Sequence, residues 1–338
     1  MEKPYSQEVF LQSLRERLPA HQSLSDVLSD ILHLSEDSAY RRIRGEKQFS
    51  LDELCIVCRY FNVSADQLSG GFSHHVLFDG EYILPEQFDF SAYLTAQESV
   101  LTFIRNQQQK HIIFLCKDIA VYHYFLFPEI ASFKYFSWMR VLLNFPALQH
   151  KKFSLTFLQE EIVQQGKRLA ELYYQVPGTE ILNADNILTT LRQIEYFKDA
   201  RLFETTEDLV RVYDSLEKMV DHIRDMAAEG KKFLPGKDPS FSTGSYDLYI
   251  NSFYVGDNTL LVKAGDRSFC FIVHSGTNFV KTTDASFCKY QQQFADQLIR
   301  RSTLISTVAE REREQFFALI KQRIHAYRDN NVQTLGNF

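Results

Sequence analysis

Apolar residues recur at helical spacing in short runs along the first 68 residues of the chain. In Ser6–Leu18 they share one face of a helix, which Pro19 ends. Ser23 or Ser25 is able to cap a second helix, and Ser35 caps a third that ends at Gly45. This pattern predicts a bundle of short helices.

The third and fourth helices have the clearest internal patterns. We expect Ala39, Tyr40 and Ile43 of the third helix to face inward. Ser50 and Glu53 have the spacing of a capping box, so a fourth helix begins there. Its expected packed positions are Leu51, Leu54, Cys55, Cys58 and Phe61, and a last turn follows from Ser64 to Leu68.

A linker at residues 70–73 separates a helical domain, residues 1–69, from a larger region at 74–330. That region is expected to contain short strands within Val76–Leu84, a helix over Ser91–Gln108 and a buried strand over His111–Cys116. The remaining expectations are a mostly helical part at about 121–230, an antiparallel β meander at 246–283, closing helices at 284–328 and a frayed tail at 329–338. The predicted fold class is α+β, predominantly helical, with an all-α N-terminal domain.

One helix of the larger region has a regular apolar seam. Thr205 and Asp208 cap its start, and Gly230 ends it. Steps of three and four residues separate the seam positions, which are Leu209, Val212, Leu216, Met219, Ile223 and Met226. This spacing fits two interpretations, a dimer seam and packing within a single helical bundle.

Composition limits the classes of function. The net charge of −6 offers no overall attraction to nucleic acid, so any DNA contact must come from a local basic patch. Five scattered cysteines do not form a disulfide pattern, and we found neither a signal peptide nor an apolar run long enough to cross a membrane. These observations predict a cytoplasmic protein. The 29 Phe and 17 Tyr residues fit either a solid core or a pocket for an apolar small-molecule effector.

Residues 28–47 have the features of two helices joined by a tight turn. Leu34 is the apolar residue of the turn, and Ser35 caps the helix that follows. In a helix-turn-helix, the N-terminal part of that helix enters the major groove of DNA. Short polar side chains lie there, and basic residues gather toward the far end, where they reach phosphates: Glu36, Asp37 and Ser38, then Arg41, Arg42, Arg44 and Lys47.

This segment resembles the phage-repressor-like (XRE-type) helix-turn-helix family of DNA-binding domains. The resemblance rests on Leu28-Ser29, Leu34-Ser35, Arg44-Gly45-Glu46-Lys47 and the helix from Ser50 that ends before Val63-Ser64, with Gly45 one residue later than is usual. It covers about a fifth of the chain. It implies that Ser25 contacts phosphate and that Glu36, Asp37, Ser38 and Arg41 face bases.

The domain is nevertheless acidic. Residues 1–69 contain eight Lys and Arg against eleven Asp and Glu, a net charge of −3. Residues 38–48 alone contain four basic residues and one acidic residue. We therefore expect a basic edge on an acidic domain, with weak, salt-sensitive non-specific binding to DNA.

Other candidate chemistry is weak. Cys55-Ile56-Val57-Cys58 lacks the context of a redox or zinc site, and its cysteines are expected to be small core residues. His74-His75 has no partner at ligand spacing, while His123, Cys270 and His274 could meet only in the folded chain. No catalytic motif is present, so we predict no catalytic residue, metal or cofactor and expect a protein that is not an enzyme.

The sequence predicts a sequence-specific transcription regulator that binds double-stranded DNA. One helix-turn-helix contacts few bases, so a homodimer on a pseudo-palindromic operator is expected, with the larger region supplying dimerisation and sensing. The alternative is a protein–protein adaptor that uses the helix-turn-helix as a contact module. An enzyme in the larger region is the less favoured third interpretation.

Overall fold

A computed structural model of the 338-residue chain describes residues 7–15, 17–19, 22–61, 63, 76–80, 88–254, 256–274 and 278–335. The chain divides into two compact units, Met1–Leu77 and Phe78–Phe338. The predicted linker at 70–73, the turn from Ser64 to Leu68 and the His74-His75 pair lie outside the described residues.

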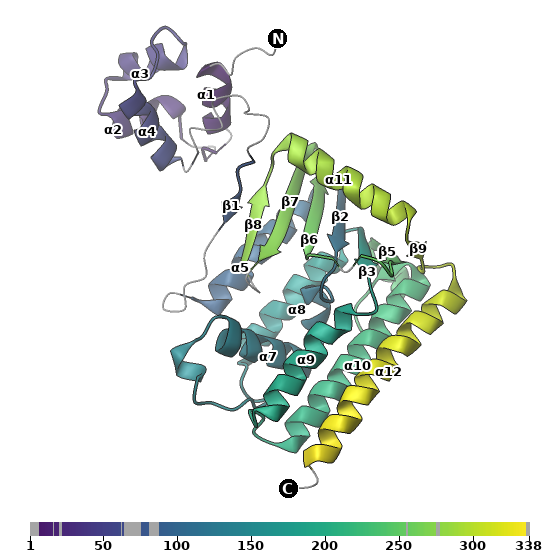
Figure 1. Cartoon of the computed structure of the whole chain (residues 1–338). Coiled ribbons are helices and arrows are strands. Elements are labelled where there is room, and N and C mark those ends of the chain that lie inside the picture. The colour runs from purple at the N-terminus through teal and green to yellow at the C-terminus, as the bar shows by residue number, and fades with distance from the viewer. Residues whose placement is uncertain are drawn as a thin grey trace. The chain divides into compact units, whose positions relative to one another are not determined.

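The N-terminal unit contains the four predicted helices: α1 (Gln7–Arg15), α2 (Leu24–Leu32), α3 (Glu36–Ile43) and α4 (Leu51–Tyr60) (Figure 1). Residues from all four helices, together with Val63, form its apolar core: Phe10, Leu11, Leu14, Leu24, Leu28, Ala39, Val57 and Cys58. Burial of this shared core is what stabilises helices that are too short to persist alone in water.

A mixed sheet lies at the centre of the C-terminal unit. Its strand order is β1 (Asp79–Gly80), β8 (Asn278–Thr282), β7 (Arg267–His274), β6 (Thr259–Ala264), β2 (Lys110–Leu115), β3 (Gly178–Leu182), β5 (Gly244–Ile250) and β4 (Lys231–Lys232), with β9 (Thr303–Leu304) also paired to β5. β2, β3 and β5 are parallel, whereas β6, β7 and β8 form an antiparallel meander.

One prediction about this sheet was wrong, and one of its strands was not predicted. The predicted helical part at 121–230 contains β3, and the predicted meander at 246–283 excludes β5, which pairs with β3 instead of β6. β3 is buried at all five positions, and a strand buried on both faces lacks the alternation that identifies a half-exposed strand. The observed architecture is α+β and mostly helical, as predicted.

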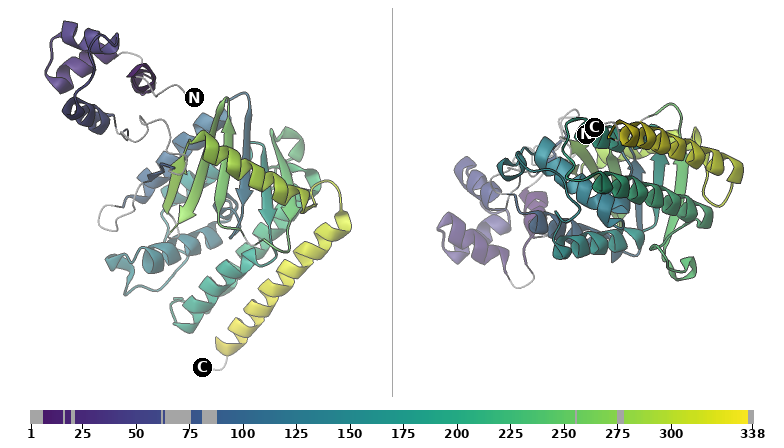
Figure 2. Two further views of the ribbon diagram at one scale, coloured as in Figure 1. Left: turned by 45° about the horizontal axis from the view of Figure 1, so that its top comes forward. Right: turned by 90° about the horizontal axis from the view of Figure 1, so that it is seen from below.

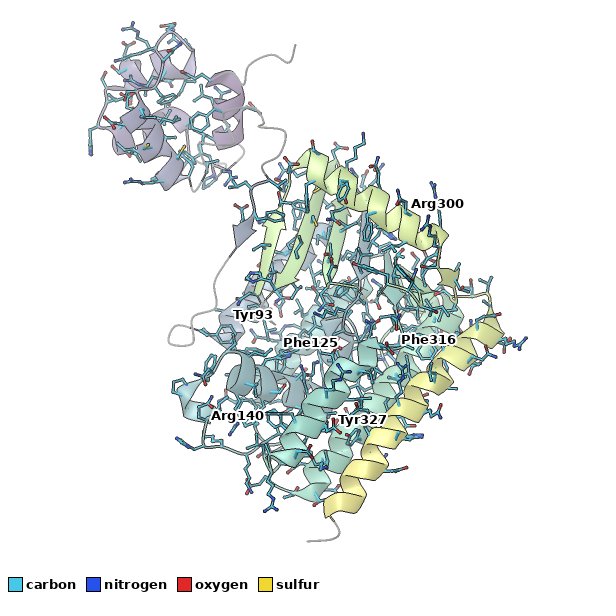
Figure 3. All side chains as sticks on the ribbon, viewed as in Figure 1. Tyr93, Phe125, Arg140, Arg300, Phe316 and Tyr327 are labelled. Carbon is cyan, nitrogen blue, oxygen red and sulfur yellow. The ribbon has the colours of Figure 1, made fainter. Side chains whose placement is uncertain are left out.

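Helices cover both faces of the sheet (Figures 1 and 2). On one face, α11 (Ala285–Arg300) packs Cys288 and Ala295 against Ile113 and Leu261. The other face has the larger core, to which these helices contribute: α5 (Phe90–Arg105), α6 (Val121–Tyr124), α7 (Pro128–Ser137), α8 (Glu160–Tyr174), α9 (Asn186–Asp199), α10 (Thr206–Glu229) and α12 (Glu310–Leu335). In Figure 3, Phe125 and Phe316 are labelled members of this core.

α10 is the helix with the apolar seam, and the structure corrects its tentative assignment as a dimer seam. The predicted caps are present, with a Thr205–Asp208 capping box and Gly230 at φ 64°. The seam residues are all buried within one chain: Leu209, Val212, Leu216, Met219, Ile223 and Met226. They belong to the core that α10 shares with α7 and α12, so packing within the bundle was the right interpretation.

The end of the chain differs from its prediction as well. Residues 329–335, expected to fray, continue α12, which runs to Leu335. Within the described residues, no helix combines the length and apolar character needed to cross a bilayer.

Candidate nucleic-acid interface

The turn between α2 and α3 has the predicted helix-turn-helix geometry. His33 ends α2 in the left-handed conformation at φ 52°, and the backbone N–H of Leu34 donates to the carbonyl of Ser29 at 2.9 Å. Leu34 is half-buried, as the plug of such a turn should be. Ser35 then caps α3, because its side chain accepts a hydrogen bond from the backbone N–H of Ser38 at 3.4 Å. The N-terminal end of α3 faces solvent, since Ser35, Glu36 and Asp37 are all exposed.

Most of the predicted base-facing side chains lie on the surface of α3. Glu36, Asp37 and Arg41 are exposed, and Ser38 is half-exposed with its hydroxyl bonded to that of Ser35. Tyr40 was expected in the core but is 44% exposed, on the same helix and beside Arg44, whose guanidinium carbon lies 6.0 Å from the ring centre. Helical spacing places Tyr40 one turn after Glu36 and Asp37, so it joins the exposed face rather than the core.

Arg42 does not belong to this surface, which corrects its predicted role as a phosphate contact. It is buried and donates to Glu53 of α4 through Nη2 at 2.5 Å and through Nε at 3.1 Å. Its Nη1 also donates to the carbonyl of Ser38 at 3.0 Å. This bond to Arg42 lowers the pKa of Glu53. Arg42 thus fastens α3 to α4 and orients the exposed face from behind.

Ser25 was also misplaced by the resemblance. Ser23, not Ser25, is the N-cap of α2, with its side chain accepting from the N–H of Asp26 at 3.2 Å. The Ser25 side chain is buried, and its hydroxyl lies 2.7 Å from that of Ser23. A buried hydroxyl with an internal partner cannot reach a phosphate.

The basic end of the interface is formed by Arg41, Arg44 and Lys47, which are all exposed. Glu46 lies close to both arginines, with its carboxylate 3.8 Å from Arg41 and 3.4 Å from Arg44. Gly45 turns the chain here at φ 75°, in the left-handed region that favours glycine. Pairs this exposed are weak, so the two arginines can exchange Glu46 for a phosphate at little cost.

The Cys-x-x-Cys segment splits between surface and core. Cys58 is buried as expected, but Cys55 is exposed, together with Leu51. Both had been assigned to the packed face of α4. No group of three or more His, Cys, Asp or Glu side chains within the described residues is arranged to hold a metal ion.

A buried polar cluster in the C-terminal unit was not predicted. His123 of α6 contacts Glu180 of β3 through Nε2 at 2.9 Å, and the hydroxyls of Tyr173 and Tyr246 donate to the same carboxylate at 2.7 and 2.9 Å. Burial would raise the pKa of Glu180, but the charge and hydrogen bond of His123 lower it to about 2. Burial lowers the pKa of nearby Lys232 to about 8.

The surroundings of His123 show whether it shares a site with Cys270 and His274. His123 contributes to the cluster on the side of the large core, whereas Cys270 belongs to the smaller core on the face covered by α11. His123, Cys270 and His274 therefore do not form a common site. Both His123 and Glu180 are fully enclosed, so the cluster lacks the access that a catalytic site requires.

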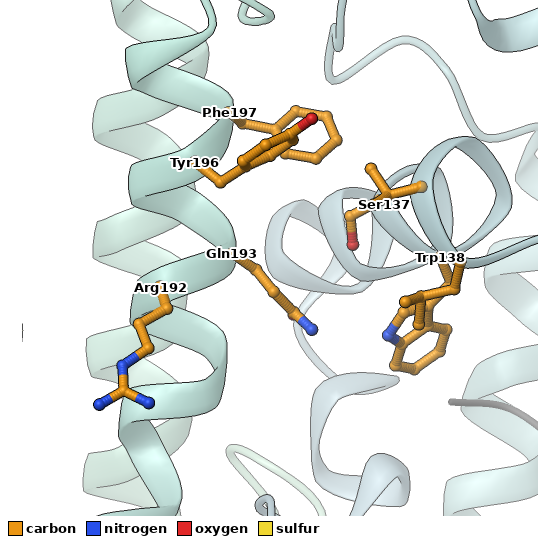
Figure 4. Close-up of a pocket in the computed structure, with 8 residues that line it drawn as sticks. Ser137, Trp138, Arg192, Gln193, Tyr196 and Phe197 are labelled. Carbon is orange, nitrogen blue, oxygen red and sulfur yellow. The ribbon is translucent and has the colours of Figure 1, made fainter. Parts of the chain in front are cut away.

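The aromatic residues between Tyr122 and Trp138 pack mainly against aromatic side chains from other parts of the same core. Tyr122 stacks on Tyr173 with ring centres 4.2 Å apart, and Phe133 stacks on Phe203 at 5.7 Å. A small pocket lies beside them, between α9 and the π-helical turn η2 (Trp138–Leu142) (Figure 4). Its volume of about 190 Å³ is below the roughly 300–1,000 Å³ of typical small-molecule sites.

Comparison with known proteins supports the assignment of the N-terminal unit. Residues 6–77 match the family model of the BetR domain, a family of helix-turn-helix-like DNA-binding domains. The match covers α1 to α4 and about a fifth of the chain. No curated protein and no solved structure matches the sequence.

Proposed function

We propose that this protein is a sequence-specific, DNA-binding transcription regulator that acts in the cytoplasm. The observation that carries the proposal is the arrangement of α3. Its capped N-terminal end presents short polar side chains, its far end presents Arg41 and Arg44, and Arg42 holds it from behind against α4. The match of residues 6–77 to the BetR domain supports DNA as the ligand of this surface.

The position of each side chain on α3 decides whether it would contact a base or a phosphate. A helix fits the major groove, where the edges of each base pair present a distinct pattern of donors and acceptors. Asp37 and Ser38 are short enough to meet base edges, while Arg41 is able to bind guanine through two hydrogen bonds. Arg44 and Lys47, which lie beyond the groove-facing end, fit phosphate contacts that position the helix.

The proposal includes a homodimer on a pseudo-palindromic operator, and an XRE-like mode of reading. A single helix of eight residues contacts too few base pairs to select one site in a genome, and two copies double the contacts. The proposal also includes a small apolar effector. The pocket beside Trp138 and Tyr196 is the place where it would bind.

We further propose that the C-terminal unit does not catalyse a reaction. His123 and Glu180 resemble the histidine–carboxylate pair of some active sites. Both are enclosed among tyrosine side chains. A protein–protein adaptor is the second candidate function, favoured by the exposed apolar residues Leu51 and Tyr60 of α4.

Selection from a random DNA pool tests the proposed function. The full-length protein should enrich an inverted repeat whose half-sites are about one helical turn apart, roughly 10 base pairs. An adaptor that does not read DNA would enrich no motif over the starting pool, and that result would reject the proposal. A single unrepeated motif would retain DNA reading and reject the homodimer.

A further inference from the structure

We infer that the exposed face of α4 is a contact surface for a second copy of this chain. The face is defined by Leu51, Asp52, Cys55, Ile56, Arg59 and Tyr60. Its large apolar members are well exposed, Leu51 at 75%, Ile56 at 42% and Tyr60 at 56%. The inference rests on the proposed function only in that a dimeric DNA reader needs such a contact.

Helical geometry places these side chains on one half of the α4 surface, with Leu51 and Tyr60 at its two edges. At 3.6 residues per turn, Asp52, Cys55, Ile56 and Arg59 follow one line along the helix. Val57 and Cys58, which are buried in the core of the N-terminal unit, point the other way. An exposed helix face that carries several large apolar side chains is typical of a surface that is covered in the working assembly.

Charge complementarity identifies the occupant as a second copy in antiparallel orientation. The midpoint of α4 falls between Cys55 and Ile56, so a twofold axis there places Asp52 of each copy opposite Arg59 of the other. Parallel packing would place Asp52 against Asp52, which is repulsive. Neither Asp52 nor Arg59 has an ion-pair partner within the described residues, so both remain available for this pairing.

The surface is small, and this decides how it should be tested. A ten-residue helix is about 15 Å long, and its face alone buries less than the roughly 800 Å² per partner of a stable complex. The contact is therefore weak by itself and is reinforced when DNA or the larger unit brings two copies together. A covalent trap detects such a contact better than molecular sizing does.

Cys55 supplies the trap. It lies next to the proposed axis, and it is the exposed member of the five cysteines, all of which are described. Copper–phenanthroline with oxygen should join two copies through a Cys55–Cys55 disulfide, and the oxidant accepts the two electrons while two protons are released. The cysteines of two copies must come within a few ångströms for this to occur. Cys55→Ser should form no covalent dimer.

Charge reversal gives the decisive comparison in the full-length protein without DNA. Asp52→Arg alone and Arg59→Asp alone should each slow covalent dimer formation roughly fivefold, because like charges then meet. The double variant D52R/R59D should recover the wild-type rate. Both new charges oppose the helix dipole, so recovery cannot come from a more stable helix.

Two results would overturn the inference. One is an equal rate of dimer formation in the wild type, the two single variants and the double variant, which would indicate random collision. The other is a monomer in which thiol reagents do not reach Cys55, which would mean that the rest of the same chain covers the α4 face. Failure of the wild type to enrich DNA, with the charge-dependent dimer intact, would instead reject the proposed function and leave this surface standing.

Discussion

Neighbouring arginines on α3 differ in their exposure and in the partners that they contact. The Arg41 side chain is 54% exposed and pairs loosely with Glu46, whereas Arg42 is 1% exposed and makes two hydrogen bonds to Glu53. An exposed pair contributes little to stability, while a buried charge that loses its partner is costly. Substitutions at these two positions should therefore have different consequences.

We expect Arg42→Ala to lower the free energy of unfolding of the N-terminal unit by about 2–3 kcal/mol, because it removes the guanidinium that donates to both carboxylate oxygens of Glu53 and to the Ser38 carbonyl. Arg41→Ala should change stability by less than about 0.5 kcal/mol. Urea unfolding followed by circular dichroism measures both. Equal effects of the two substitutions would show that the Arg42–Glu53 pair does not fasten α3.

His222 predicts a pH dependence of stability in the C-terminal unit. Burial lowers its pKa to about 4, although its ring donates to the Phe233 carbonyl at 2.7 Å. Above pH 6.5 the histidine is neutral in both the folded and the unfolded chain. As pH falls from 6.5 toward 4, the unfolded chain takes up the proton first, so stability falls by up to about 3 kcal/mol.

The matched variant for this prediction is His222→Gln, which retains a donor and does not titrate. Its unfolding free energy should change less than that of the wild type between pH 7 and pH 4.5. If both proteins lose the same stability over that interval, His222 is not the group responsible.

At the scale of elements, α10 shows that an apolar seam does not by itself identify a dimer interface. A heptad-like spacing in a long helix fits a coiled coil and a bundle equally well, because both need one apolar stripe. The seam of α10 is covered by α7 and α12 of the same chain. Leu216, fully buried there, tests this assignment.

We expect Leu216→Ala to destabilise the C-terminal unit by about 3 kcal/mol through loss of contacts and a residual cavity, with no change in oligomeric state. The exposed neighbour Lys218→Ala should have almost no effect. Thermal unfolding and light scattering give the two readouts. A dissociated but equally stable variant would restore the dimer-seam interpretation.

The sequence predicted what short-range patterns determine and missed what long-range packing decides. The caps at Ser35, Ser50 and Thr205 depend on residues three positions apart, so they were predicted correctly. Arg42 is buried because its partner Glu53 arrives from another helix, and no local pattern reveals that pairing. β3 was missed because helices bury both of its faces, so its residues do not alternate between apolar and polar.

Long-range packing also decides which of the predicted site residues are exposed. Ser35, Glu36, Asp37, Arg41, Arg44 and Lys47 are exposed as DNA contacts must be, whereas Ser25 and Arg42 are buried. Tyr40 could have been assigned to the surface from its place one turn after Glu36. The contacts to DNA themselves stay predictions.

At the scale of the whole molecule, charge limits how DNA is bound. The chain has a net charge of −6, and the basic residues of the proposed interface are few. If Arg44 and Lys47 of two copies each neutralise one phosphate, the logarithm of the binding constant should fall with the logarithm of salt concentration with a slope of about −4. Binding of operator DNA over a series of salt concentrations measures it.

Lys47→Ala should reduce that slope by about 2 in a dimer, since one phosphate contact per copy is lost, and should weaken binding to all sequences alike. A change in sequence preference instead would place Lys47 at the bases. An unchanged salt dependence of binding would show that Lys47 does not contact DNA.

The central claim is that the exposed face of α3 binds DNA, and one comparison tests it most directly. Arg41→Ala with Arg44→Ala is measured against Arg300→Ala with Arg301→Ala, which removes the same charge from exposed positions at the end of α11 (Arg300 is labelled in Figure 3). Fluorescence anisotropy with DNA selected by the wild-type protein should show binding lost in the first variant and kept within about twofold in the second. Equal binding by both variants would contradict the claim.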